Sequence, residues 1–209
     1  MLINYIYFRG KWEEPFEVSL THEFDFYVNE NTKVTVDMME RTDQFDFYRD
    51  QENSTSIIKL PYKGNASMMI VLPDKGKMEE LEKQISRDHF KNWEEKLSKT
   101  FVTLYMPRFK MSAFISLQET LQEMGMVEAF SGAADFSGLS EDSKLMLSKA
   151  VLKVNEEGTE ADAALIVELR LLSGWLSEIM VLNRPFLVFI LDSSTRSILF
   201  MGKVNNPTE

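Results

Sequence analysis

Residue types that commonly perform covalent or metal chemistry are scarce in this sequence of 209 residues. It contains no cysteine, which excludes disulfides, thiol catalysis and cysteine metal sites. The two histidines, His22 and His89, lie far apart and no third ligand is evident, so we expect solvated or capping histidines and no metal site. No G-x-S-x-G pattern marks a nucleophilic serine. The sequence therefore predicts neither an enzyme nor a bound cofactor.

The most informative pattern is a run of small and polar residues, 156–164, that leads into an apolar tail. Read in steps of two, one set is uncharged: Thr159, Ala161, Ala163, Leu165, Val167 and Leu169. Four of the six residues between them are charged: the set is Glu160, Asp162, Ala164, Ile166, Glu168 and Arg170. Such alternation is typical of a half-buried β-strand. Small side chains at the start of the uncharged face suit a strand that inserts between two others.

A helix is the alternative interpretation of the same segment. Its alanine and glutamate content favours helix formation. Ala161, Leu165, Leu169 and Leu172 also form an apolar stripe at helical spacing. Composition alone leaves both conformations open.

The elements around this segment are predicted from hydrophobic periodicity. Strands are expected at 2–8, 24–28, 33–39, 45–48, 56–60, 67–72, 100–106, 109–111 and 145–154. An almost wholly apolar C-terminal pair, 185–191 and 198–204, is expected to form a central hairpin. Helical spacing occurs between 78 and 97 and again at 117–125. Strands and helices without a regular βα alternation indicate an α+β fold.

Several blocks, in the order expected, resemble the serpin family of serine protease inhibitors: 4–12, 72–74, 106–109, 180–190 and 200–207. The nearest group is the secreted plasma group that includes antichymotrypsin and antitrypsin. The resemblance implies the C-terminal half of a serpin domain, residues 1–209. It would contain part of the large central sheet, β-rich second and third sheets, few helices and a reactive-centre loop at about 158–178. The family's N-terminal helices and two strands of the central sheet have no counterpart here.

In this family the loop is attacked by a protease and its first half then inserts into the central sheet. The resemblance identifies the hinge of that loop as Glu156, Glu157, Gly158, Thr159, Glu160, Ala161, Asp162, Ala163 and Ala164. Gly158 supplies a flexible start because glycine imposes little φ restriction. The family register places the scissile bond between Leu172 and Ser173, and leucine fits the apolar primary pocket of chymotrypsin-like proteases. Cleavage after Arg170 by a trypsin-like enzyme would shorten the inserting strand.

The resemblance also implies a shutter, the place where the central sheet opens. Family members pair an asparagine with a histidine there. Asn4 matches the asparagine, but Ser148 stands where the histidine is expected. A serine hydroxyl can still make a hydrogen bond, with a shorter reach. Control of sheet opening is therefore expected to differ from the family pattern.

Two other functions stay open. Some relatives carry small hydrophobic hormones, in pockets among strands and a helix that resemble residues 56–72 and 78–99. The half-length chain could also be an inert fragment, since an exposed sheet edge promotes aggregation.

Charge and composition set the remaining limits. The net charge of −10 argues against nucleic acid and acidic membranes as partners. No apolar run approaches the roughly 20 residues of a membrane helix, and residues 1–3 do not resemble a secretion signal. Two sequons, at Asn53 and Asn65, are candidate N-glycosylation sites. Together with the resemblance, they predict a secreted, extracellular glycoprotein.

Overall fold

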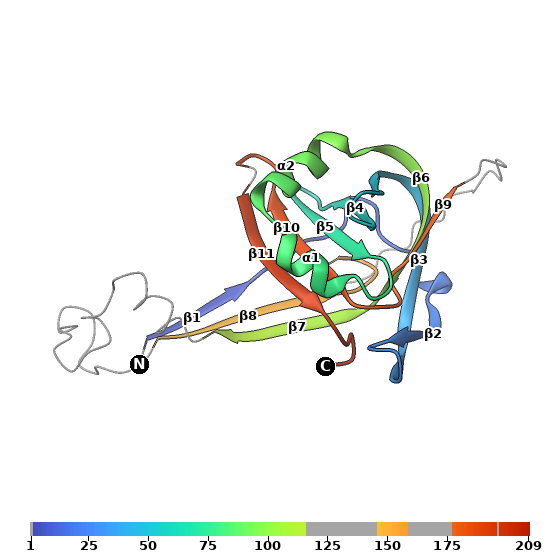
Figure 1. The fold of residues 1–209 in the computed structure, drawn as a ribbon. Helices are drawn as coiled ribbons and strands as arrows, with labels where there is room; N and C mark the ends of the chain where they lie inside the picture. The colour runs from blue at the N-terminus through green and yellow to red at the C-terminus, as the bar shows by residue number, and fades with distance from the viewer. Residues whose placement is uncertain (1, 116–145, 159–176, 196) are drawn as a thin grey trace. The chain divides into compact units, whose positions relative to one another are not determined.

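The computed structural model describes residues 2–115, 146–158, 177–195 and 197–209. The chain divides into two compact units, described separately below: residues 1–8 with 111–152, and residues 9–110 with 153–209. Figure 1 labels the strands and helices in chain order. The helix expected at 117–125 and residues 159–176 of the expected reactive-centre loop lie outside the described residues.

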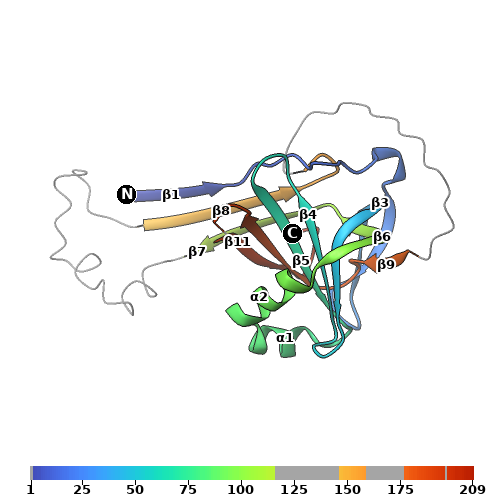
Figure 2. The same cartoon turned by 90° about the horizontal axis from the view of Figure 1, so that it is seen from above.

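The smaller unit is a three-stranded sheet in the order β1-β8-β7. Its strands are β1 (Leu2–Tyr7), β8 (Met146–Val154) and β7 (Phe109–Ile115), of which the last two extend into the larger unit. β1 and β8 are parallel, and the three strands lie side by side in Figure 2. The strands predicted at 2–8 and 145–154 are confirmed, whereas the one predicted at 109–111 is longer than expected.

The larger unit is built on an eight-stranded sheet in the order β11-β10-β5-β4-β3-β6-β9, with β2 paired to β3. Described neighbours pair antiparallel, except that β9 runs parallel to β6. A short 3-10 helix, Val18–Leu20, precedes β2. The strands are β2 (His22–Tyr27), β3 (Lys33–Asp50), β4 (Thr55–Pro61), β5 (Ala66–Pro73), β6 (Ser98–Pro107), β9 (Glu178–Val181), β10 (Phe186–Asp192) and β11 (Ser197–Val204).

One long strand replaces two predicted short ones. β3 runs through the polar residues 40–44 without a break, because β6 pairs with it along its length. The inward position in this stretch is occupied by Arg41, whose guanidinium carbon lies 4.5 Å from the Phe45 ring centroid and 5.6 Å from that of Phe16. Aromatic rings on the guanidinium make a cation tolerable at a core position. The polar residues 40–44 show no apolar alternation, so the sequence pattern predicted an interruption between two strands.

Two helices cover one face of the sheet, as Figure 1 shows. α1 spans Met78–Gln84, and α2 spans Arg87–Lys96 after a break at Ser86, whose hydroxyl accepts a hydrogen bond from the His89 backbone. Trp93 of α2 is fully buried against β4, β5 and β10. Both helices are too short to cross a bilayer, and none in the described part of the chain has the length and apolarity to do so.

Only one strand of the C-terminal hairpin lies inside the sheet. β10 lies between β5 and β11 and is buried on both faces, as its continuous apolar run predicts. β11 is an edge strand of the described sheet, and its exposed residues include Ile198, Leu199 and Met201. The expectation that both strands are central is therefore wrong for β11. Apolar content alone does not distinguish an interior strand from an edge strand.

Candidate functional site

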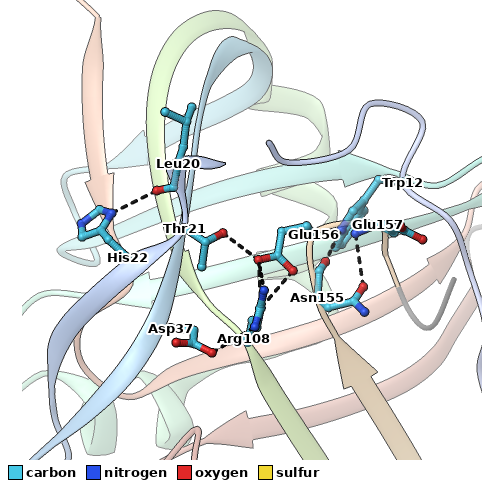
Figure 3. Close-up of polar contacts among 9 residues, drawn as sticks. All are labelled: Trp12, Leu20, Thr21, His22, Asp37, Arg108, Asn155, Glu156 and Glu157. Carbon is cyan, nitrogen blue, oxygen red and sulfur yellow. Dashed lines mark hydrogen bonds and ion pairs between the residues drawn. The ribbon is translucent and has the colours of Figure 1, made fainter. Parts of the chain in front are cut away.

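The start of the predicted loop is held by a compact group of contacts, shown in Figure 3. We call it the hinge anchor: the turn Asn155–Gly158 with the side chains of Trp12, Thr21 and Arg108. All of these residues belong to the larger unit. Of the predicted hinge, the structure describes Glu156, Glu157 and Gly158, whereas 159–164 and the predicted reactive bond, Leu172 and Ser173, lie outside the described residues.

The chain reverses direction directly after β8. The Asn155 backbone N–H donates to the Gly158 carbonyl at 2.9 Å, and the Gly158 N–H donates back to the Asn155 carbonyl at 3.2 Å. The Glu157 N–H donates to the Asn155 side-chain oxygen at 3.2 Å. This Asx-type bond explains why an asparagine stands at the first position of the turn.

Gly158 is required here for two reasons. Its φ is +127°, a region that residues with a Cβ rarely adopt. A Cβ atom at this position would also lie 2.2 Å from the Gly10 carbonyl oxygen. We predicted Gly158 as a flexible start, but in the structure it is a buried residue packed against the 10–12 segment.

Glu156 is the charged centre of the hinge anchor, and its side chain is only 5% exposed. Oε1 accepts hydrogen bonds from Arg108 Nη2 at 2.6 Å and from the Thr21 hydroxyl at 2.6 Å. Arg108 Nε also contacts both carboxylate oxygens, at 2.8 and 2.9 Å. Burial by itself would raise the pKa of Glu156, but these hydrogen bonds outweigh it and hold the pKa below its ordinary value. The ionised carboxylate is thus the stable form at neutral pH.

Arg108 connects the hinge to the sheet. Its Nη1 donates to Asp37 of β3 at 3.0 Å while Nε and Nη2 hold Glu156. The hydrogen bonds to Glu156 are the main cause of the raised pKa of Arg108. The two acidic partners differ in setting, because the Asp37 side chain is 54% exposed. Most of the electrostatic stabilisation therefore comes from the buried partner.

Trp12 completes the anchor from the other side of the turn. It is 1% exposed and stacks on Tyr62 with ring centroids 4.4 Å apart. Its indole N–H donates to the Asn155 carbonyl at 3.0 Å, and its backbone N–H donates to the Glu157 carbonyl at 2.9 Å. A further bond joins the Phe16 N–H to the Glu156 carbonyl at 2.8 Å. The carbonyls of three successive turn residues, 155–157, are therefore all hydrogen-bonded to the 12–16 segment.

This arrangement positions the start of the predicted loop. Arg108 neutralises Glu156, and the lowered pKa of that carboxylate makes it a weak base toward the Thr21 hydroxyl that donates to it. The sequence alone did not predict the roles of Trp12, Thr21 and Arg108, because these residues lie far from the hinge along the chain. The only signal was that two of them fall in blocks with family resemblance, 4–12 and 106–109.

The predicted shutter residues meet across two strands. The parallel register of β1 and β8 places Asn4 opposite Ser148. Only their backbone positions are described, so the expected hydrogen bond between them stays a prediction.

The two candidate glycosylation sites differ in environment. Asn65 is exposed. Asn53 instead donates its side-chain amide to Asp50 at 2.7 Å, and Asp50 is itself buried and bonded to the Trp93 indole at 2.9 Å. A glycan on Asn53 would use the nitrogen that makes this bond. Both sites stay predictions, and the structure favours Asn65.

The histidines have local contacts. The His89 ring contacts the hydroxyl of Ser86, the N-cap residue of α2, at 2.8 Å. His22 lies edge-on to Tyr105. Within the described ranges, no group of three or more His, Asp or Glu side chains is placed to hold a metal ion.

Comparison with known proteins agrees with this geometry. The family model described as serpin (serine protease inhibitor) matches residues 1–207. The chain is 54% identical to the alpha-1-antitrypsin homolog of Cyprinus carpio, covering 100% of this chain and 57% of that protein. It is 41% identical to human alpha-1-antichymotrypsin, covering 100% of this chain and 51% of that protein.

A solved structure supports the same assignment. The crystal structure of human thyroxine-binding globulin complexed with thyroxine superposes with a TM-score of 0.86 at 42% identity. The match covers 99% of this chain and 56% of that one. The chain thus spans about half the length of the relatives it matches. With a family model over almost every residue and the predicted α+β architecture in place, the chain belongs to the serpin family.

Proposed function

We propose that this chain carries the reactive loop of an inhibitory serpin, which traps a serine protease as a suicide substrate. The inhibitory names of relatives such as the antitrypsin homolog and antichymotrypsin support inhibition as the general role. The protease cleaves the loop, and the freed segment after Gly158 then inserts into the central sheet as a new strand. Such loop insertion is a known order–disorder switch.

The observation that carries this proposal is the topology around β8. β8 pairs in parallel with β1, and the chain turns back antiparallel to β8 at the bridge between Asn155 and Gly158. A strand that continued from this turn between β8 and β1 would be antiparallel to both. One parallel pairing would be replaced by two antiparallel pairings, which are slightly more stable per residue. Insertion therefore has a favourable direction built into the connectivity.

The hinge anchor gives the inserting strand a fixed origin. Buried contacts hold Glu156 and Gly158, so the inserting strand would begin beyond Gly158. The uncharged set that begins Thr159, Ala161, Ala163 would face inward, with the intervening charges facing solvent. Leu172 at the reactive bond points to a chymotrypsin-like protease as the target. The resemblance to the secreted plasma group supports a secreted, extracellular protein.

The experiment incubates the purified 209-residue chain with chymotrypsin and separates the products on a denaturing gel. Trapping gives a covalent band at the summed mass of chain and protease. Two variants test the insertion step. Ala163→Glu places a charge on the inward face and should convert the chain into a plain substrate, while the matched Ala164→Glu places the same charge on the outward face and should still trap. Cleavage of the wild-type chain without a covalent band would refute inhibition, and a broad, non-cooperative melt would indicate an inert fragment.

Hormone carriage is the second candidate, because thyroxine-binding globulin is among the relatives. The region that resembles the carriers' pockets is the layer between α1, α2 and the sheet. In this chain it is filled by Ile57, Trp93 and Phe189, each at most 2% exposed. Binding there would require these side chains to move. Saturable quenching of Trp93 emission by thyroxine, absent in Trp93→Phe, would support carriage over inhibition.

A further inference from the structure

A cavity of about 670 Å³ lies in the larger unit, away from the hinge anchor. This volume is within the range of about 300–1,000 Å³ typical of small-molecule sites. Three loops and the start of α1 form its walls: residues 27–30 between β2 and β3, 73–76 between β5 and α1, 183–185 between β9 and β10, and Met78 with Glu79.

The walls are joined to one another by hydrogen bonds. The Tyr27 N–H donates to the Asn183 carbonyl at 2.8 Å. Arg184 Nε donates to the Pro73 carbonyl at 2.9 Å. Each bond connects two different loops, so the cavity is formed without a ligand and binding would not require the loops to be ordered first.

Within the wall, Asp74 lies near two arginines, Arg49 and Arg184. Arg49 binds Asp74 with two hydrogen bonds, Nη1 to Oδ1 at 3.0 Å and Nη2 to Oδ2 at 2.7 Å. Arg184 is a second cation near the same aspartate, but its printed bond goes to the neutral carbonyl of Pro73. Among the described residues, no carboxylate lies within ion-pair distance of Arg184. The cluster of Arg49, Asp74 and Arg184 therefore carries one net positive charge, because only Arg49 is paired with the carboxylate.

Arg184 is also the charge least accessible to water. It is half-buried, and burial lowers its pKa. The other charged residues around the cavity, Glu30, Lys75 and Glu79, are exposed and therefore screened by solvent. A half-buried guanidinium that lacks a carboxylate partner is a site for an anion, because its fork of donors matches a carboxylate.

The rest of the lining is mainly apolar. Pro73, Met78 and Pro185 present aliphatic surface, and Tyr27 presents a ring. We propose that this cavity binds a small amphipathic carboxylate, with its anionic group on Arg184 and its apolar or aromatic body between Tyr27 and Met78. This site is independent of loop insertion.

The test uses 4-(trifluoromethyl)phenylacetate as the probe, followed by ¹⁹F NMR line broadening on the full chain. The neutral amide of the same compound is the matched ligand control. We expect the carboxylate to bind about tenfold or more tighter than the amide, since bonds to a partly buried charge are the strong ones. Arg184→Gln should lose this preference, and Arg184→Lys should keep part of it.

Two control variants separate the site from general charge effects. Lys75→Gln removes an exposed cation at the same cavity, and Arg87→Gln removes one on α2. Both should bind the carboxylate within about twofold of the wild-type chain, because exposed charges contribute little. Equal binding of acid and amide, no binding of either, or an unchanged preference in Arg184→Gln would overturn the proposal. If Arg184→Gln does not fold, the acid–amide comparison together with Arg184→Lys decides it.

Discussion

Removing the charge of Glu156 tests the hinge anchor most directly. Glu156→Gln keeps the shape and the acceptor oxygen but loses the ion pair with Arg108, whose Nη2 lies 2.6 Å from Oε1. A hydrogen bond to a charged group contributes about 1.5–3 kcal/mol. The Glu156 side chain is 5% exposed but that of Arg108 is 41% exposed, so the arginine can recover water and the loss falls short of that of a fully buried pair. We expect the free energy of unfolding to fall by about 2 kcal/mol.

The assay is urea unfolding, which reports the midpoint and the slope separately. A pure loss of the ion pair lowers the midpoint and leaves the slope unchanged. Asp37→Asn is the matched control, because it removes the other carboxylate on Arg108 at a side chain that is 54% exposed. Exposed pairs contribute about 0–1 kcal/mol, so this variant should be close to the wild type. Equal losses in the two variants would refute the claim that the buried carboxylate dominates.

Three further predictions concern the same region. The pKa of Glu156 is lower in the folded state, so this residue contributes fully to the free energy of unfolding above its ordinary pKa of about 4.5, and the contribution is lost as the pH falls through the lower folded value. In urea titrations at a series of pH values, the difference in free energy of unfolding between the wild type and Glu156→Gln should therefore disappear at acidic pH. Gly158→Ala should destabilise the chain by at least about 2 kcal/mol in thermal melts, against about 1 kcal/mol for Gly76→Ala, since both have positive φ but a Cβ meets atoms within 4 Å only at Gly158. Leu172→Arg should transfer the covalent gel band from chymotrypsin to trypsin, and an unchanged preference would place the reactive bond elsewhere.

The sequence predicted most strands because their patterns are local. Residues 68–73 form a continuous apolar run, and β5 is buried on both faces as such a run indicates. β9 was not predicted because its four residues are too few to show a periodic pattern, and the strand is defined by its pairing with β6. The polar centre of β3 was missed because Arg41 is compatible with the core only when Phe16 and Phe45 cover it.

The hinge anchor shows the same division between local and distant information. Asn155 and Gly158 could be predicted as turn residues, since their conformations follow from their own chemistry. The pairing of Glu156 with Arg108 spans 48 residues, and its bond to Thr21 spans 135. A single sequence contains many acidic and basic residues, and nothing in their spacing selects these partners.

The position of β10 inside the sheet decides what would follow a cut in the backbone at the predicted reactive bond, between Leu172 and Ser173. The downstream piece, 173–209, contains β9, β10 and β11, and β10 is hydrogen-bonded on both sides, to β5 and to β11. Scission there would therefore yield a non-covalent heterodimer of two polypeptides rather than a shed peptide. In native buffer, the cleaved chain should elute from a gel-filtration column at the same volume as the intact chain. The 173–209 fragment should separate from the rest only in denaturant.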